Sequence, residues 1–311
     1  MRTYRYWKGK NHFLLKGWIM VGPDWYRCVI SSLLIIVPNV ITIIYACSYY
    51  LNEDDAGPLV ILLFLSSLSL ITLIKAATSD PGYIPKQIVP FVSQQSSALN
   101  EYIGCPKPIL VPYNGSVIKL KFCQTCLIFK PPRCSHCSIC DLCVEGFDHH
   151  CPWIGNCVGK RNYKDFMGFL SSVSALTVVS FSINLSHIVD TYDDSNLDTK
   201  TTPSIVIAVF CFLAMWLILG LFGFHLYLVM NNMTTNEKIK GLWDEMHLNP
   251  YFRGSLWKNI VYWIYKKRGI PQFYRRKILS PYHENINPNE FYRGVKITRE
   301  YTEVSIENKP L

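Results

Sequence analysis

Four long apolar runs divide the chain, at about residues 28–51, 58–77, 166–189 and 203–230. A transmembrane helix needs roughly 20 apolar residues, so each run is long enough to cross a bilayer. Pro38 lies inside the first run, which a membrane helix tolerates where its neighbours satisfy the freed backbone groups. A buried helix of a large soluble domain would show a charged face, and these runs carry almost no charge. The pattern therefore predicts an α-helical polytopic membrane protein with four transmembrane helices.

The charges outside these runs are sorted by side. The N-terminal segment 1–27 holds six bases and one acid, and the tail 231–311 holds fourteen bases and eight acids. The long loop 78–165 is also net basic, whereas the two short loops between the other runs are acidic. By the positive-inside rule, both termini and the long loop are predicted to be cytosolic. The net charge of +9 would then face anionic lipid, so it does not indicate a nucleic-acid partner.

The two largest cytosolic segments have an internal organisation of their own. The loop 78–165 begins with a Pro- and Ser-containing linker, which includes residues 94–97, and continues into a cysteine-rich domain at about 121–165. The tail contains the stretch LWKNIVYWIY at 256–265, which is too short to cross a bilayer and is followed by three bases. Its apolar residues recur at helical spacing, which favours an interfacial helix on the cytosolic leaflet.

Eight of the twelve cysteines lie between Cys123 and Cys157, together with three histidines. The pairs CQTC and CSIC have the spacing of metal knuckles. A cytosolic domain keeps its thiols reduced, and a mixture of thiolates and imidazoles favours zinc. Two closed four-ligand sites would use eight of these eleven groups. The spacing alone does not say which three groups remain.

Asp148, His149, His150 and Cys151 are consecutive. Adjacent side chains on an extended backbone point in different directions, so one histidine can bind metal while its neighbour faces another partner. A cysteine beside an imidazole favours a thiolate near neutral pH. An aspartate on the other ring nitrogen fixes the tautomer of that histidine. The alternative, that all four are plain zinc-site residues, stays open at this point.

The segment 123–166 resembles the DHHC cysteine-rich domain of the protein S-acyltransferases, or palmitoyltransferases. Three further motifs of that family stand at matching places, namely DPG at 80–82, TTNE at 234–237 as the TTxE motif, and NPY at 249–251 with Asn259. Four helices with the domain between the second and third are the architecture of that family. The stretches KPPRCSH at 130–136 and GPD at 22–24 resemble the branch that contains plant and Ras palmitoyltransferases.

The resemblance implies two structural zinc ions. It implies that the first is bound by Cys123, Cys126, His136 and Cys143, and the second by Cys137, Cys140, His150 and Cys157. By the same resemblance Cys151 is the acylated nucleophile, His149 the general base and Asp148 its orienting carboxylate. Thr235 resembles the family threonine that lies near this aspartate. Cys134 has no role carried over from the family.

The resemblance also implies a reaction in two steps. Palmitoyl-CoA would acylate Cys151, and a cysteine of a membrane-apposed substrate protein would then take the acyl group. Lys130 and Arg133 are predicted to meet the CoA phosphates. The expected partners are the bilayer, acyl-CoA and substrate proteins with cytosolic cysteines near the membrane, while an accessory subunit stays open. The expected location is an endomembrane, in the Golgi or endoplasmic reticulum, or the plasma membrane.

Two other functions compete with this interpretation. A non-enzymatic zinc-finger membrane scaffold would need the eight zinc ligands but would not need Cys151. A channel or transporter is disfavoured, because the apolar runs lack paired charges or broken helices at mid-depth.

Two positions inside the apolar runs have predicted roles of their own. Leu176, about three turns into the third run, is predicted to limit acyl-chain length, and His225 is an intramembrane ionisable group or a hydrogen-bonded packing residue.

Overall fold

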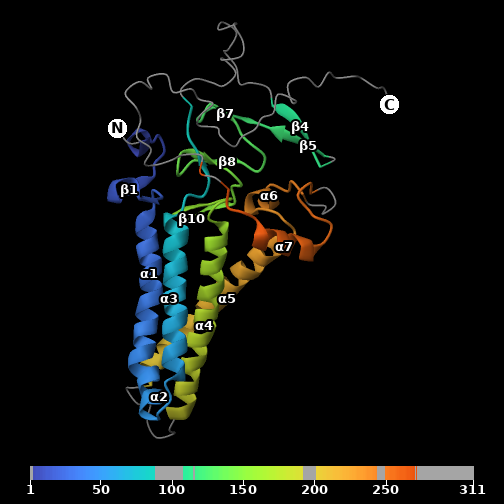
Figure 1. Ribbon diagram of the computed structural model, residues 1–311. Coiled ribbons are helices and arrows are strands. Elements are labelled where there is room, and N and C mark those ends of the chain that lie inside the picture. Colours follow the sequence, from blue (N-terminus) through green and yellow to red (C-terminus); the bar gives the residue numbers. More distant parts are fainter. Residues whose placement is uncertain are drawn as a thin grey trace, which may run out of the picture.

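The computed structural model has four long helices in the described part of the chain. They form a bundle, and a domain of short strands lies at one end of it (Figure 1). The structure describes residues 3–87, 108–114, 116–191, 201–243, 249–269 and 271. The predicted linker around 94–97 and the tail beyond residue 271 lie outside the described residues.

All four long helices are long and apolar enough to cross a membrane. The first runs from Trp25 to Asn52 and comprises α1 (Trp25–Thr42), a π-helical turn η3 (Ile43–Cys47) and α2 (Ser48–Asn52). The others are α3 (Gly57–Thr78), α4 (Tyr163–Thr191) and α5 (Thr202–Met230). Each extends beyond its apolar run at one or both ends, because helical turns continue into the polar boundary residues.

Pro38 lies within α1 and does not end it. The side chain of Asn39 donates to the carbonyl of Ile35 at 2.6 Å, and the hydroxyl of Thr42 donates to the carbonyl of Pro38 at 3.0 Å. Small polar side chains thus bond to backbone carbonyls at and before the proline, an arrangement that membrane helices tolerate.

Helix α4 packs along both α3 and α5, and α1 packs along α3. The buried side chains between them include Leu62, Leu73 and Leu170. On the outer faces Phe64 and Leu217 are 64% and 77% exposed. Large exposed apolar surface is unusual for a soluble protein and normal for one that faces lipid. The four-helix architecture predicted from the apolar runs is therefore confirmed.

The domain between α3 and α4 is built from pairs of short strands. The three-stranded sheet has the order β3 (Tyr83–Ile84), β9 (Leu142–Val144) and β8 (Ser135–Cys137). Antiparallel pairs join β4 (Ile109–Tyr113) to β5 (Ser116–Leu120), β6 (Phe122–Cys123) to β7 (Ile128–Phe129), and β10 (His149–Cys151) to β11 (Asn156–Val158). Strands this short do not build an independent hydrophobic core. The fold of this domain therefore depends on its cysteines and histidines.

Segments from both ends of the chain pack near this domain. The N-terminal part contains η1 (Thr3–Tyr6), η2 (Leu15–Gly17) and the hairpin of β1 (His12–Leu14) with β2 (Ile19–Val21). After α5 come α6 (Thr235–Ile239) and α7 (Leu256–Tyr265). Figure 1 shows both of these helices beside the strand-bearing end of the bundle. Trp257 and Tyr265 of α7 are largely exposed.

Two asparagines attach the β10–β11 hairpin to the end of α3. The amide of Asn156 donates to the carbonyls of Ala77 and Ser79, and the amide of Asn162 donates to the carbonyl of Ala76. The last carbonyls of a helix have no partner within the helix, so these bonds satisfy them. They also fix the hairpin at the end of the membrane bundle.

Candidate active site and metal centres

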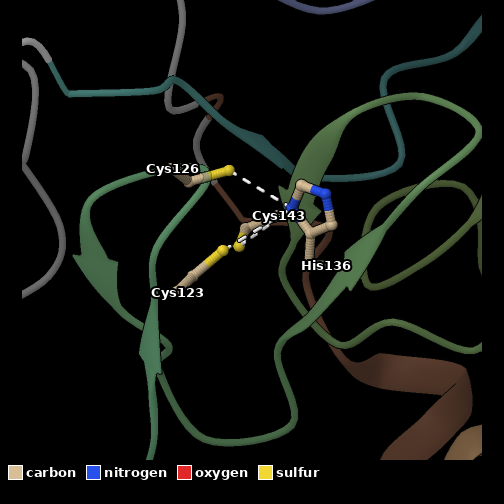
Figure 2. A group of neighbouring side chains, drawn as sticks. All are labelled: Cys123, Cys126, His136 and Cys143. Atoms are coloured by element: carbon tan, nitrogen blue, oxygen red, sulfur yellow. Dashed lines mark hydrogen bonds between the residues drawn. The ribbon is translucent and has the colours of Figure 1, made fainter. Parts of the chain in front are cut away.

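The first group of metal-ligating side chains comes from β6, the turn after it, β8 and β9. Figure 2 shows three thiols converging on one histidine ring. The sulfur atoms lie 3.4 to 3.9 Å from Nδ1 of His136, at 3.6 Å for Cys123, 3.4 Å for Cys126 and 3.9 Å for Cys143. The tight CQTC turn brings its two thiols together, and the β8–β9 pairing brings His136 opposite Cys143.

The second group has the same composition and interleaves with the first along the chain. Nδ1 of His150 lies 3.6 Å from the sulfur of Cys137, 3.4 Å from that of Cys140 and 3.5 Å from that of Cys157. His150 and Cys157 stand opposite each other in the β10–β11 pair. Because the two groups alternate in sequence, closing either one constrains the chain that forms the other.

Both groups fit a tetrahedral zinc ion. Zinc–sulfur and zinc–nitrogen bonds of about 2.3 and 2.05 Å at a tetrahedral angle place sulfur and nitrogen roughly 3.6 Å apart. The six sulfur–nitrogen distances given above are close to that value. The ligand atoms in each group all lie within 4.8 Å of one another. These are the two sets that the family resemblance implies, and each set can hold a metal ion. Cys134 belongs to neither and packs beside the first.

The alternation of strand β10 separates the two adjacent histidines. Residues i and i+2 of a strand share a face, so His149 and Cys151 lie on one face and His150 on the other. Nδ1 of His149 lies 2.7 Å from Oδ2 of Asp148. The Cys151 thiol is 3% exposed and forms a further hydrogen bond with the His149 ring. The structure thus brings Asp148, His149 and Cys151 together in the order of a catalytic triad.

The charge on His149 is set by these contacts. Burial lowers the pKa of the ring, but the hydrogen bonds with Asp148 and Cys151 outweigh it and raise the pKa to about 9. Burial likewise raises the pKa of Asp148, yet the bonds from His149 and Thr235 leave it below its ordinary value. The ring is therefore positively charged at neutral pH, between the Asp148 carboxylate and the Cys151 thiol.

Thr235 binds Asp148 directly. Its hydroxyl donates to Oδ2 of Asp148 at 2.6 Å, and its backbone N–H donates to Oδ1 at 2.8 Å. A threonine at the start of a helix could instead cap the helix end, but here the preceding residue, Thr234, is the N-cap. Thr234 and Glu237 form a capping box at the start of α6, which leaves the Thr235 side chain to orient Asp148.

Arg133 binds the start of α6, the helix that carries Thr235. Its guanidinium binds the carboxylate of Glu237 at 2.9 and 2.7 Å, donates to the side chain and carbonyl of Asn232, and stacks on the ring of Tyr251. Sequence reasoning missed this arrangement, since Glu237 was noted only as part of the TTNE motif. Arg133 therefore links the KPPRCSH stretch to the TTNE and NPY motifs.

The tail motif braces the end of α5. Asn249 donates to the carbonyl of Asn231 at 2.8 Å, and Asn259 donates to the carbonyl of Met230 at 2.7 Å. Asn249 and Asn259 are both nearly fully buried. The NPY segment and α7 thereby hold the chain that carries Thr235 against the bundle.

His225 of α5 contacts the catalytic histidine from the membrane side. Its ring centre lies 5.7 Å from that of His149 and 5.0 Å from that of Phe166, and its Nδ1 lies 3.0 Å from the hydroxyl of Tyr163. The side chain is 1% exposed. Both sequence interpretations of His225 hold in part, because it is hydrogen-bonded packing that also touches the site. The signal was its ionisable ring inside an apolar run.

A charged pocket of about 250 Å³ adjoins the triad. Six bases and two acids line it, namely Arg133, Lys160, Lys164, Lys266, Lys267 and Arg268 with Glu145 and Asp148. Several of these bases have partners, since Lys160 pairs with Glu145 and Arg268 binds Asp165 at 2.7 Å. Within the described chain, Lys266 and Lys267 form no ion pair. Lys130 does not line this pocket, so its predicted contact with CoA stays a prediction.

A second cavity, of about 330 Å³, lies among the helices and is almost wholly apolar. Side chains of α1, α4 and α5 line it, together with Trp153 from the turn after Cys151. Leu176 lines it, and so do its neighbours Val173 and Ser180. Cys151 packs in the same hydrophobic cluster as Leu176. The structure thus places Leu176 in the wall of an apolar cavity that Trp153, two residues after Cys151, also lines.

The fold and the site define a polytopic membrane protein with a buried Asp148–His149–Cys151 group beside two clusters that could each hold a metal ion. Residues 116–242 match the sequence profile of the DHHC palmitoyltransferases. Together with relatives that are up to 39% identical and of which the chain covers more than two thirds, this match shows that the chain belongs to the DHHC palmitoyltransferase family, a family of protein S-acyltransferases.

Similar curated proteins support this assignment. Palmitoyltransferase ZDHHC14 of Mus musculus is 38% identical over 273 residues, covering 83% of this chain and 56% of that protein. Palmitoyltransferase ZDHHC18 of Mus musculus is 36% identical, with 83% and 71% covered. Palmitoyltransferase ZDHHC9 of Homo sapiens is 39% identical, with 81% and 72% covered. The chain thus spans between about half and three quarters of these relatives.

Proposed function

We propose that the protein transfers a long-chain acyl group from acyl-CoA through a thioester on Cys151 to cysteines of membrane-apposed proteins. The observation that carries this is the position of the triad. Asp148 lines the charged pocket, while Trp153, two residues after Cys151, lines the apolar cavity, and Cys151 belongs to the same buried cluster as Leu170 and Leu176 of that cavity. An acyl-CoA has one charged part and one apolar part, and its thioester joins them.

In the first step the Cys151 thiolate attacks the thioester carbon of acyl-CoA. The bond from that carbon to the CoA sulfur breaks, and the departing thiolate takes the proton of the His149 imidazolium. In the second step neutral His149 accepts the proton of a substrate thiol, whose sulfur attacks the Cys151 thioester and releases the Cys151 thiolate. Asp148 holds the His149 ring in place throughout, and the energetic advantage comes mainly from positioning.

The two clusters are proposed to bind structural zinc, with Cys123, Cys126, His136 and Cys143 at one site and Cys137, Cys140, His150 and Cys157 at the other. Four protein ligands leave no open position for catalysis. Zinc would supply folding free energy to a domain whose strands are too short to fold alone.

The charged pocket is proposed to bind the phosphates of CoA. Lys266 and Lys267 form no ion pair in the described chain, and Lys160 adds charge at the same pocket. Arg133 contributes less directly than the sequence suggested, because four of its hydrogen bonds go to Glu237 and Asn232. The apolar cavity is proposed to hold the acyl chain, at roughly 0.8 kcal/mol per buried methylene.

We propose that both termini and the zinc domain are cytosolic, in a Golgi, endoplasmic reticulum or plasma membrane, with α7 on the cytosolic leaflet. The exposed Trp257 and Tyr265 of α7 support this, since aromatic rings favour the interface. A glycan acceptor placed at Asp54, in the turn between α2 and α3, should be glycosylated. An acceptor near Gln95 should not be, and its glycosylation would contradict the topology.

Autoacylation of the purified protein tests the proposal. Labelled palmitoyl-CoA should label the wild type, and neutral hydroxylamine should release the label. Cys151→Ser should take up none while keeping its fold and metal content. Cys134→Ser is the matched control, because this cysteine lies in the same domain outside both clusters, and it should label normally. Equal labelling of Cys151→Ser and wild type would overturn the enzyme assignment and favour the scaffold.

A further inference from the structure

Each histidine of the two metal clusters faces a carboxylate on the side away from its thiols. In both rings Nδ1 points at the three sulfurs, which leaves Nε2 free. Nε2 of His150 lies 3.5 Å from Oδ2 of Asp24, and Nε2 of His136 lies 3.6 Å from Oδ1 of Asp141. Nε2 of His150 is buried and has no hydrogen-bond partner. The two clusters are built from different residues of the same types, and in both of them Nε2 of the histidine lies near a carboxylate.

Asp24 is placed unusually for its residue type. It occupies the N-cap position of α1, where an aspartate ordinarily accepts a bond from the first turn, yet its side chain makes no capping bond. Among the described residues, Asp24 accepts a hydrogen bond through its backbone carbonyl, from the N–H of Arg27 at 2.9 Å. The carboxylate is instead available to His150, with Arg27 more distant at 3.9 Å.

Close backbone packing holds Asp24 in that place. A Cβ atom on Gly22 would lie 2.0 Å from the carbonyl oxygen of Gly155, and a Cβ atom on Gly155 would lie 2.4 Å from the carbonyl oxygen of Asp24. Gly155 also has a φ of +63°, which favours glycine. The backbone of the segment before α1 therefore packs closely against the turn of the β10–β11 hairpin. Ser31 of α1 adds a bond of 2.7 Å to the carbonyl of Trp153 in that turn.

We propose that Asp24 and Asp141 are positioning residues that accept a hydrogen bond from Nε2–H of the zinc-ligating His150 and His136. Such a bond fixes the tautomer that offers Nδ1 to the metal and makes the ring a better ligand. Asp141 acts within the cysteine-rich domain, and Lys86 binds its other oxygen. Asp24 acts from outside the domain, so the N-terminal segment stabilises the site that carries β10. This inference concerns the metal sites and holds whether or not the proposed acyl transfer is correct.

Site-resolved thiol protection tests this pairing. The full-length protein in detergent would be challenged with a zinc chelator and an alkylating reagent, and modified cysteines would be mapped by mass spectrometry. Loss of an outer-shell partner weakens metal binding by about 10- to 100-fold. Asp24→Asn should therefore expose Cys137, Cys140 and Cys157 at least about 10-fold faster than in wild type, and Asp141→Asn should do so for Cys123, Cys126 and Cys143.

Each variant serves as the control for the other, since each should accelerate its own cluster clearly more than the opposite one, which it reaches only through the interleaved chain. Asp24→Glu keeps a carboxylate and should recover part of the protection, whereas Arg27→Gln, which removes only the neighbouring charge, should change little. Wild-type protection of both clusters in the two asparagine variants would overturn the proposal. Equal acceleration at both clusters in either variant would also overturn it, because that result indicates general loss of stability.

Discussion

The two cavities beside the triad differ in almost every physical property. The charged pocket is lined from the cysteine-rich domain, the start of α4, the end of α5 and the segment after α7, and six of its side chains are basic. The apolar cavity is lined from α1, α4 and α5, inside the predicted membrane layer. Asp148 lines the first, and Trp153, two residues after Cys151, lines the second. Under the proposed function, the difference matches the polarity of an acyl-CoA, with the reacting carbon between its charged part and its apolar part.

This division separates two kinds of selectivity. Contacts between exposed charges are screened by salt at distances near 10 Å, and single pairs contribute roughly 0 to 1 kcal/mol. Burial of each methylene contributes about 0.8 kcal/mol regardless of salt. The charged pocket should therefore set affinity for the CoA part in a salt-sensitive way, and the apolar cavity should set chain-length preference. The triad between them should affect all acyl donors alike.

The largest effect is expected at the triad. Thr235→Val removes the hydroxyl that donates to Asp148 but keeps the backbone N–H that binds the other oxygen. A hydrogen bond to a charged group contributes about 1.5–3 kcal/mol, so single-turnover acylation of Cys151 should slow by roughly 10- to 100-fold. The factor should be the same for C14 and C18 acyl-CoA.

Thr235→Ser is the matched control for this change, because it keeps the hydroxyl and should retain most of the rate. A Thr235→Val protein that acylates at the wild-type rate would show that the backbone contact alone orients Asp148. If Thr235→Val slowed acylation with only one of the two chain lengths, the triad would also affect chain-length preference, which would contradict the separate roles of triad and cavity.

A smaller effect is expected in the apolar cavity. Leu176→Trp fills part of the slot, so longer chains should lose contact first. Each excluded methylene costs about 0.8 kcal/mol, or roughly 4-fold, and the C18-to-C14 ratio in competition should fall by at least that factor. Val173 and Ser180 line the same cavity, so Val173→Trp and Ser180→Trp should shift the ratio in the same direction.

Val178→Trp is the matched control on the same helix, since this side chain is exposed on the outer face. It should leave the C18-to-C14 ratio unchanged. An unchanged ratio in all three cavity variants would mean that the acyl chain lies along another wall.

The parts of the molecule that follow from local pattern could be predicted from the sequence. The apolar runs predicted the four helices, because length and the lack of charge are properties of each run alone. The two metal clusters followed from the family motif, although spacing alone left the partition open. The location of Thr235 beside Asp148 also came from the motif and not from periodicity.

The parts that depend on distant contacts could not be predicted. Lys130 and Arg133 look alike in the sequence, yet Arg133 reaches Glu237, which lies more than one hundred residues later, and Lys130 does not line the charged pocket. The contact of His225 with His149 joins α5 to β10, and nothing local to either segment indicates it. The sequence around Asp24 indicates an ordinary helix cap, and its position beside His150 is visible only in the folded structure.

The smallest effect is expected in the charged pocket and depends on pH. Burial lowers the pKa of Lys266 to about 8, and the positive charges of Arg133, Lys160 and Arg253 add to this while Glu145 opposes it. Below pH 8 the ammonium is present to bind phosphate, and above pH 8 it is lost. The apparent KM for palmitoyl-CoA should therefore rise by roughly 2- to 5-fold between pH 7 and pH 9, as expected for one partly exposed ion pair.

Two substitutions isolate this rise from the titration of other groups. Lys266→Arg keeps its charge across the range, because a guanidinium does not titrate below about pH 12, so its KM should stay low at both pH values. Lys266→Gln should show the weaker KM already at pH 7 and little further change. The apparent KM of the wild type should therefore match that of Lys266→Arg at pH 7 and that of Lys266→Gln at pH 9. If Lys266→Gln rises as steeply as wild type, the pH dependence belongs to another group and Lys266 does not bind the CoA phosphates.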